Sequence, residues 1–362
     1  MSSPHQSSGP FALLLISALT VTLATIPAIA GTPAAGALDA RPVLNASVHG
    51  VHGIAASDRD AVDGDIPTSG RGSPFFVRQV YPEAFFFGAS NLDTGNWESH
   101  PVWSANANAP RPANGYYRWR WQSGPVWADY FAQSLGLTAE ASANGGGNYA
   151  FGAAGTSPHP GEPMADPGTP THALYLSTQI DEALADHPGG LDGAAIYVFA
   201  IGDNDVPIFG RTPAEAPTAA GVVITQMQRL LAAGARRFVV RTLPPGQDPY
   251  ATPFNNALLQ GLPVLRAAGA KVYVVNAAEF VGTYLTVGYL AGIGITQFGP
   301  GINCRADAAC QAAARTAALA GQIHDHTFLF FDAIGPHFNH RVHREMADHA
   351  LLQLPLFENG FD

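Results

Sequence analysis

Ser90 lies in a segment that is suited to presenting a nucleophile. It comes two positions after the apolar run AFFFG (84–88), inside the segment FGASNLDTGN (87–96). Gly88 permits a tight turn at the end of a strand, and such a turn presents the Ser90 hydroxyl and backbone N–H at the edge of a sheet. A serine hydroxyl held in this way attacks an acyl carbon when a neighbouring base removes its proton.

Three further clusters carry groups suited to the same chemistry. NYAFGAAGT (148–156) is a turn of small residues, IGDND (201–205) offers amide and carboxylate side chains, and FFDAIGPHFNHRVHREMA (from 330) contains an aspartate and three histidines. Histidine exchanges protons near neutral pH, and amide groups donate to a developing oxyanion. Each cluster also has a purely structural interpretation, since small residues let a helix approach a sheet, and Asp and Asn favour turns wherever they occur.

The elements that must position these clusters follow from the hydrophobic pattern. Five short apolar runs predict strands, at 84–88, 195–202, 237–243, 271–276 and 327–332. Helices are predicted at 124–136, 171–186, 217–234, 253–269 and 338–353. Fully apolar strands separated by helices indicate a parallel sheet that is covered on both faces.

The predicted arrangement is therefore one α/β/α sandwich. Ligands bind such sheets at the carboxyl ends of the strands, so clusters that follow different strands can meet there. The regions 101–123, 144–170 and 282–325 are rich in loop-forming residues, and we expect them to form the walls of a pocket.

These clusters resemble the sequence blocks of the GDSL (SGNH) hydrolases. FGASNLDTGN is similar to the family's FGDSLSDTGN and shares Gly88, Ser90 and the run DTGN (93–96), while Ala89 and Asn91 replace the usual Asp and Leu. NYAFGAAGT is similar to NYAVGGAT, and IGDND is similar to GxND. The resemblance covers most of the chain and implies a flavodoxin-like α/β/α sandwich with a parallel sheet of about five strands.

Carried over residue by residue, the resemblance makes Ser90 the nucleophile. It assigns three donors to the oxyanion, namely the backbone N–H groups of Ser90 and Ala153 and the side-chain amide of Asn204. The family has a glycine where this chain has Ala153. Only the backbone donor is needed there, and we expect the alanine to keep an ordinary φ.

The catalytic base is the point at which this sequence departs most from the family. GDSL enzymes usually read DxxHP, and a count of three from Asp332 reaches Gly335, which does no acid–base chemistry. HFNHRVHREMA resembles the family's HPTxxxHxxxA, with His343 at the later histidine, and this register selects His337 as the base. Two extra residues then separate Asp332 from His337, which leaves open whether Asp332 still reaches the imidazole.

A metal site formed by His337, His340 and His343 is disfavoured. Steps of three residues on a helix turn the rings apart across its surface, and the chain has no HExxH motif. We therefore expect no metal and no organic cofactor, with His340 and His343 either exposed or satisfied in the core.

The aromatic residues around the first block leave two interpretations open. They either line an apolar pocket for an acyl chain or belong to the core. The residues are Trp97, Trp103, Tyr117, Trp119 and Trp121.

The N-terminus predicts export. An apolar stretch without charged residues, FALLLISALTVTLATIPAIA, ends at an AxA site, so residues 1–30 are expected to be a cleaved signal peptide, with a single membrane anchor as the alternative. Residues 31–75 are rich in Gly, Ala, Ser, Pro and Asp and predict a flexible leader, followed by the hydrolase domain at 76–362. We expect a secreted or periplasmic protein with no stable membrane span after cleavage.

Cysteine content and charge add two expectations. The chain has two cysteines, and an exported protein meets an oxidising compartment, so Cys304 and Cys310 are expected to form a disulfide, with free thiols as the alternative. The 28 acidic and 18 basic residues give a net charge of −10, which repels nucleic acid. Nucleic acid is therefore not an expected partner.

Together these features predict a secreted serine esterase or lipase. It would hydrolyse carboxylic esters through an acyl-enzyme on Ser90, with a small-molecule, lipid or sugar ester as substrate. The departures from the family pattern also fit an SGNH-fold binding protein that has lost catalysis, and an acyltransferase or polysaccharide deacetylase would use the same site. Acyl chain length, alcohol moiety and oligomeric state do not follow from the sequence.

Overall fold

The computed structural model describes residues 81–158, 174–247, 249–299, 301–332 and 337–355. The predicted signal peptide and leader lie outside the described residues, as do the first residues of the predicted hydrolase domain and Gly335.

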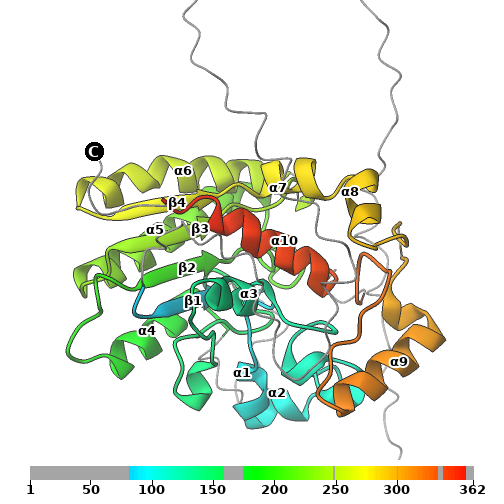
Figure 1. Cartoon of the computed structure of the whole chain (residues 1–362). Coiled ribbons are helices and arrows are strands. Elements are labelled where there is room, and N and C mark those ends of the chain that lie inside the picture. The colour runs from blue at the N-terminus through cyan, green and yellow to red at the C-terminus, as the bar shows by residue number, and fades with distance from the viewer. Residues whose placement is uncertain (1–80, 159–173, 248, 300, 333–336, 356–362) are drawn as a thin grey trace, which may run out of the picture. The chain divides into compact units, whose positions relative to one another are not determined.

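A parallel sheet forms the centre of the described part (Figure 1). Its strands occur in the order β1-β2-β3-β4, and each pairs in parallel with the next. The strands are β1 (Ala84–Gly88), β2 (Ile196–Ala200), β3 (Arg237–Arg241) and β4 (Lys271–Val275). Each lies inside a run that the apolar pattern predicted.

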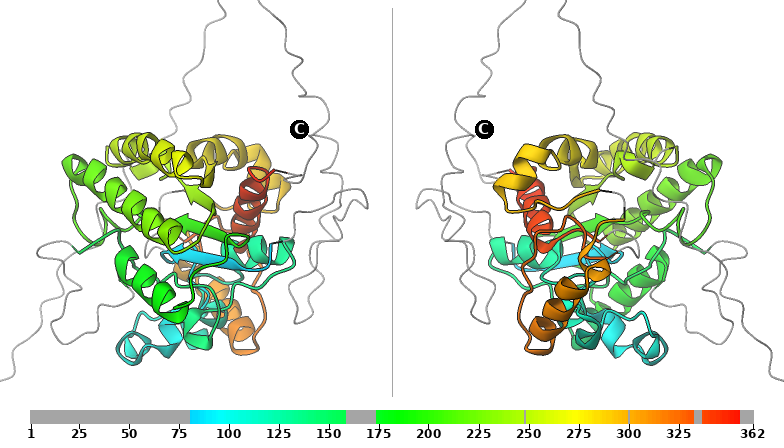
Figure 2. Two further views of the ribbon diagram at one scale, coloured as in Figure 1. Left: turned by 90° about the vertical axis from the view of Figure 1, so that its left-hand side faces the viewer. Right: turned by 90° about the vertical axis from the view of Figure 1, so that its right-hand side faces the viewer.

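Helices cover both faces of this sheet, as the alternation of strands and helices requires (Figure 2). Ten α-helices are described in all. They are α1 (Asn96–Ser99), α2 (Pro101–Ala105), α3 (Trp127–Ser134), α4 (Leu176–Asp186), α5 (Ala216–Ala232), α6 (Ala251–Ala267), α7 (Ala277–Tyr284), α8 (Val287–Gly292), α9 (Ala308–Leu319) and α10 (His340–Leu351).

The side chains of β1 show how one strand serves two cores. Successive side chains of a strand point to opposite faces. Phe85 and Phe87 accordingly lie in the core beneath α4, α5 and α6, whereas Phe86 lies in the core beneath α3 and α10. All three are at most 2% exposed. The expected α/β/α sandwich is confirmed.

The predicted fifth strand, at 327–332, is wrong. The segment makes only isolated bridges among the described residues. Its backbone groups bond to loops instead, with the Leu329 N–H donating to the Gln297 carbonyl at 2.8 Å and the Phe331 N–H to the His337 carbonyl at 2.8 Å. Because these loops use its hydrogen-bonding groups, the segment does not extend the sheet beyond β4.

Two of the expected loop-rich regions contain helices. Helix α2 lies within 101–123, and helices α8 and α9 lie within 282–325. Helix α9 has the sequence AACQAAARTAAL, and alanine is the residue with the highest helix propensity. The third region, 144–170, is described only up to residue 158. Within the described residues, no helix combines the length and apolar character needed to cross a membrane.

Candidate active site

The turn that carries Ser90 begins at the end of β1 and is held by β2 and α4. A Cβ on Gly88 would lie 2.1 Å from the Ala200 carbonyl oxygen of β2, so only glycine fits there. The Gln179 side chain of α4 binds both backbone groups of Gly88, at 2.8 Å to the N–H and 2.9 Å to the carbonyl. Ser90 is 9% exposed, and its hydroxyl makes no hydrogen bond to any described residue. A nearly buried hydroxyl thus lies on a fixed backbone.

Asp93 ties this turn to the small-residue turn at 148–156. One carboxylate oxygen accepts from the N–H groups of Gly95 (2.9 Å) and Asn96 (2.8 Å), and the other accepts from the N–H of Gly152 (2.8 Å). Asp93 is fully buried, and this burial raises its pKa to about 6, against the opposing effect of these hydrogen bonds. In the comparison with the family's first sequence block, Asp93 was a matching residue, but we assigned it no role.

Ala153 corrects one of our expectations. Its φ is 71°, in the left-handed region that favours glycine, and not the ordinary φ predicted for an alanine. The backbone N–H groups of Ala153 and Ser90 donate to no described residue. The alanine therefore keeps the left-handed backbone that suits the glycine usual in the family, and its N–H has no partner within the described part of the chain.

Asn204 lies after β2 and is oriented by the same turn. Its Nδ2 donates to the Ala154 carbonyl at 2.9 Å, and the residue is 8% exposed. The neighbouring Asp205 is fully buried and accepts from both the N–H and the hydroxyl of Thr156, each at 2.9 Å. These bonds join the second and third sequence blocks, and one amide proton of Asn204 remains to donate elsewhere.

Asp332 reaches the imidazole of His337 despite the longer spacing. His337 Nδ1 lies 2.9 Å from Asp332 Oδ1, and both residues are buried. The Phe331 N–H donates to the His337 carbonyl at 2.8 Å, which holds the backbone next to Asp332 close to His337. Residues 333–336 lie outside the described residues. No hydrogen bond joins the described side chains of Ser90 and His337.

The side chain of Trp121 connects the fourth block to the others. Its ring lies 5.3 Å from the His337 ring, centre to centre, and its Nε1 would be 2.0 Å from a Cβ on Gly152. Trp121 therefore fills the space between the turn that carries Ala153 and the candidate base. The four blocks are thus linked, since Trp121 lies between the second and the fourth, and Asp93 and Asn204 join the first and third blocks to the second.

Most of the aromatic residues proposed for an acyl pocket belong to the core. Trp97, Trp103 and Trp121 pack on one another and are at most 6% exposed, and Tyr117 is 5% exposed. Trp119 is partly buried against the same cluster. The indole N–H of Trp97 donates to the Gly152 carbonyl at 2.9 Å, so this ring supports the small-residue turn at 148–156.

His340 and His343 have structural roles, but they do not fan across a surface as we expected. His343 is 1% exposed, and its Nδ1 accepts from the N–H of Trp127, the first residue of α3. Burial lowers its pKa to about 3, so the ring is neutral and can accept. His340 bridges Tyr130 (3.1 Å) and Asp325 (3.2 Å). Both rings turn inward because α10 packs on α3.

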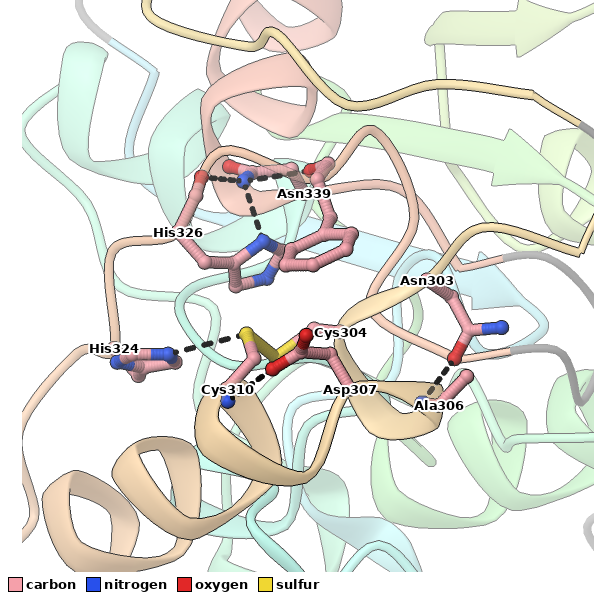
Figure 3. Close-up of a disulfide and its surroundings, with 9 residues drawn as sticks. Asn303, Cys304, Ala306, Asp307, Cys310, His324, His326 and Asn339 are labelled. Carbon is pink, nitrogen blue, oxygen red and sulfur yellow. Dashed lines mark hydrogen bonds between the residues drawn. A yellow bond between two sulfur atoms is a disulfide. The ribbon is translucent and has the colours of Figure 1, made fainter.

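The predicted disulfide between Cys304 and Cys310 is confirmed (Figure 3). It closes a turn at the start of α9, where the Asp307 side chain accepts from the Cys310 N–H at 2.8 Å. His324 Nε2 lies 3.5 Å from Cys310 Sγ. These three Cys and His residues form the one metal-capable grouping found among the described residues, and both sulfurs are used by the disulfide.

Sequence reasoning missed two residues that hold the site. Gln179 binds the backbone before Ser90, and Tyr116 donates a hydrogen bond to Asp332. Their partners are 91 and 216 positions away along the chain, so no local pattern marks them.

Known proteins match the chain across this site. The family model for GDSL-like lipases and acylhydrolases matches residues 85–350. "Lipase 1" of Photorhabdus luminescens is 30% identical over 169 residues, which are 46% of this chain and 22% of that protein. The matched stretch is thus less than a quarter of that relative. Because the family match spans well over half of the sequence and all the candidate site residues, the chain belongs to the GDSL-like lipase/acylhydrolase family.

Proposed function

We propose that this protein is a serine hydrolase that cleaves carboxylic esters through an acyl-enzyme on Ser90. The observation that carries the proposal is the 2.9 Å contact between His337 Nδ1 and Asp332 Oδ1. A carboxylate at Nδ1 fixes the tautomer that leaves Nε2 unprotonated, which is the form that acts as a base. Family membership supports the reaction class.

In the proposed mechanism, His337 Nε2 takes the proton of Ser90 as Oγ attacks the ester carbonyl carbon. The N–H groups of Ser90 and Ala153 and the remaining amide proton of Asn204 stabilise the oxyanion. The protonated imidazole then gives its proton to the departing alcohol. Water attacks the acyl-enzyme while His337 Nε2 takes its proton; the bond between the acyl carbon and Ser90 Oγ then breaks, the imidazolium returns the proton to Oγ, and the acid is released. Asp332 orients the imidazole and stabilises the imidazolium that forms.

The left-handed backbone of Ala153 supports its part in this mechanism. A non-glycine residue at φ 71° costs about 1 kcal/mol or more, and such strain is retained where the surrounding contacts impose it. Here Asp93 and Trp97 bind the N–H and carbonyl of the preceding Gly152. The turn is therefore fixed from two sides, and the Ala153 N–H is left without a partner among the described residues.

We further propose that the protein is exported. The support is the apolar N-terminal segment with its AxA site and the disulfide, which persists in oxidising compartments. N-terminal sequencing of the protein recovered from the medium or periplasm of its host tests this. A start near Gly31 agrees with cleavage after Ala30, whereas an intact N-terminus in the cell membrane would favour the anchor.

Kinetics with a short p-nitrophenyl ester test the enzyme proposal. Ser90→Ala and His337→Ala are each expected to abolish nearly all activity, and because such residues act as a unit the double variant should lose little more. His340→Ala serves as the control, since His340 contacts Tyr130 and Asp325 and not the proposed site. A fully active His337→Ala enzyme would refute the assignment of the base. Product analysis with added alcohol acceptors separates hydrolysis from acyl transfer.

A further inference from the structure

The carboxylate of Asp332 has a second partner besides the imidazole. Its Oδ1 accepts from His337 Nδ1, and its Oδ2 accepts a hydrogen bond from the Tyr116 hydroxyl. Asp332 is 2% exposed and Tyr116 is fully buried. Because different residues hold the two oxygens, the carboxylate cannot rotate without breaking a buried hydrogen bond. Oδ1 therefore stays directed at the imidazole.

Arg305 fixes the direction of the bond from Tyr116. Its guanidinium donates to the Tyr116 hydroxyl at 2.7 Å and lies 5.1 Å from the centre of that ring. Arginine has no acceptor, so the hydroxyl must accept from Arg305 and use its own proton for Asp332. Burial, and next the charge of Asp332, raise the pKa of Tyr116 well above its ordinary value, which keeps that proton in place.

The guanidinium of Arg305 is directed at Tyr116. Within the described part of the chain it forms no ion pair with a carboxylate. Two hydrogen bonds in series, from Arg305 to the Tyr116 hydroxyl and from that hydroxyl to Asp332, connect it to the carboxylate, and it polarises the hydroxyl toward that carboxylate. This is the arrangement needed to hold an ionised carboxylate in a buried site, where an unpartnered charge is costly.

The disulfide turn positions Arg305 and Asp332 together. Arg305 follows Cys304, and its backbone N–H donates to the Phe331 carbonyl at 3.0 Å, one residue before Asp332. The N–H of Cys304 donates to the carbonyl of Phe330 at 3.1 Å. The same turn thus supports the backbone that carries Asp332 and supplies the cation behind Tyr116.

We propose that Tyr116 and Arg305 are positioning residues for the catalytic carboxylate, linked through the Cys304–Cys310 turn. They hold Asp332 in the rotation that orients His337 and touch no substrate themselves. This inference rests on the proposed function, because it assigns both residues to the same catalytic group.

Steady-state kinetics of Tyr116→Phe test the proposal. The substitution removes the hydroxyl and keeps the ring, so kcat should fall about 10- to 100-fold with KM within twofold, less than the ~10⁴-fold loss expected without the carboxylate. Tyr289→Phe is the matched control, since it also removes a hydroxyl that donates to a buried carboxylate, that of Glu345. The control should keep wild-type kcat. An unchanged kcat in Tyr116→Phe would overturn the proposal.

A double-mutant cycle separates positioning from a general structural effect. If Tyr116 acts through Asp332, Tyr116→Phe in an Asp332→Ala background should change kcat less than twofold. Equal losses in both backgrounds would refute action through the carboxylate. Arg305→Lys should retain more activity than Arg305→Gln, because the lysine keeps the cation behind Tyr116, and the reverse order would contradict the role of the charge.

The outcomes also separate this inference from the proposed function. If the wild-type protein hydrolyses the ester and Ser90→Ala does not, the proposed function holds whatever the Tyr116 variants show. An active wild type with an unaffected Tyr116→Phe variant would refute the positioning role alone. An inactive wild type would refute the proposed function, and the positioning role would fail with it.

Discussion

The left-handed backbone of Ala153 predicts that Ala153→Gly stabilises the protein. An alanine at φ 71° costs about 1–2 kcal/mol relative to an ordinary conformation, whereas glycine adopts this φ without strain. Glycine loses about 0.5–1 kcal/mol more backbone entropy on folding, which offsets part of the gain. The net stabilisation should be about 0.5–1 kcal/mol. The proposed oxyanion donor is a backbone N–H, so activity should be kept.

The preceding residue gives the opposite prediction and serves as the comparison. A Cβ at Gly152 would lie 2.0 Å from Nε1 of Trp121 and 2.9 Å from Nε1 of Trp97. Both indoles are buried in the cluster behind the turn, so Gly152→Ala should overpack it and cost about 1–3 kcal/mol. Displacement of Trp121 from the His337 ring should also lower kcat.

Urea denaturation of the two variants and the wild type measures both changes in the free energy of unfolding. The urea concentration at the midpoint should rise for Ala153→Gly and fall for Gly152→Ala. The m value, which is the slope of the free energy of unfolding against urea concentration, should not change. The corresponding thermal midpoints should shift by a few degrees, since about 1 kcal/mol corresponds to ~2–4 °C in a domain of this size. A clear loss of stability in Ala153→Gly would refute the argument from the left-handed φ.

Three further predictions follow from the site and its surroundings. Asn204→Ala should lower kcat by roughly 10²–10³ with little change in KM, because an oxyanion donor acts mainly in the transition state; a raised KM at constant kcat would place Asn204 in substrate binding. Burial lowers the pKa values of His326 and His343 to about 3, so below about pH 6.5 their rings bind protons in the unfolded chain and not in the folded chain, which destabilises the fold. Asp93 has the opposite effect, because its pKa is raised to about 6 and it binds a proton more readily in the folded chain. The free energy of unfolding should therefore fall by about 2–3 kcal/mol from pH 7 to pH 5, and equal values from urea titrations at both would contradict this. Reduction of the 304–310 disulfide should cost about 2 kcal/mol or less, because it closes a short loop, which urea titrations with and without reductant would measure.

Much of the sheet could be predicted from local sequence. Strands such as Ala84–Gly88 are buried on both faces, so a continuous apolar run marks them. The run at 327–332 has the same character, yet its backbone bonds to the loops around Gln297 and His337. An apolar run indicates that a segment is buried. It does not show whether the segment pairs with a strand, because that depends on which other segments lie beside it in the folded chain. Helix α9 was missed although its alanine content carried the signal.

Some features of the candidate site could likewise be predicted from local sequence, and others depend on the fold. The sequence blocks identified Ser90, Asn204 and His337, because each lies in a short pattern at the end of a predicted strand or the start of a predicted helix. Residue spacing alone left open the contact of Asp332 with His337, which the folded chain shows. Tyr116 reaches Asp332 across 216 positions, and only the folded chain shows that contact. The φ of Ala153 is imposed by contacts on Gly152, and the glycine usual in the family at this position was its sequence signal, which the alanine obscured.

The most direct test of the proposed function is reaction with a fluorophosphonate followed by peptide mass spectrometry. An activated serine reacts with this reagent, so the measurement tests the nucleophile and its activation together. A single adduct on Ser90, lost in the His337→Ala variant, is the predicted result. An adduct on another serine, or an unmodified Ser90 in a protein that hydrolyses esters, would contradict the assignment of the nucleophile.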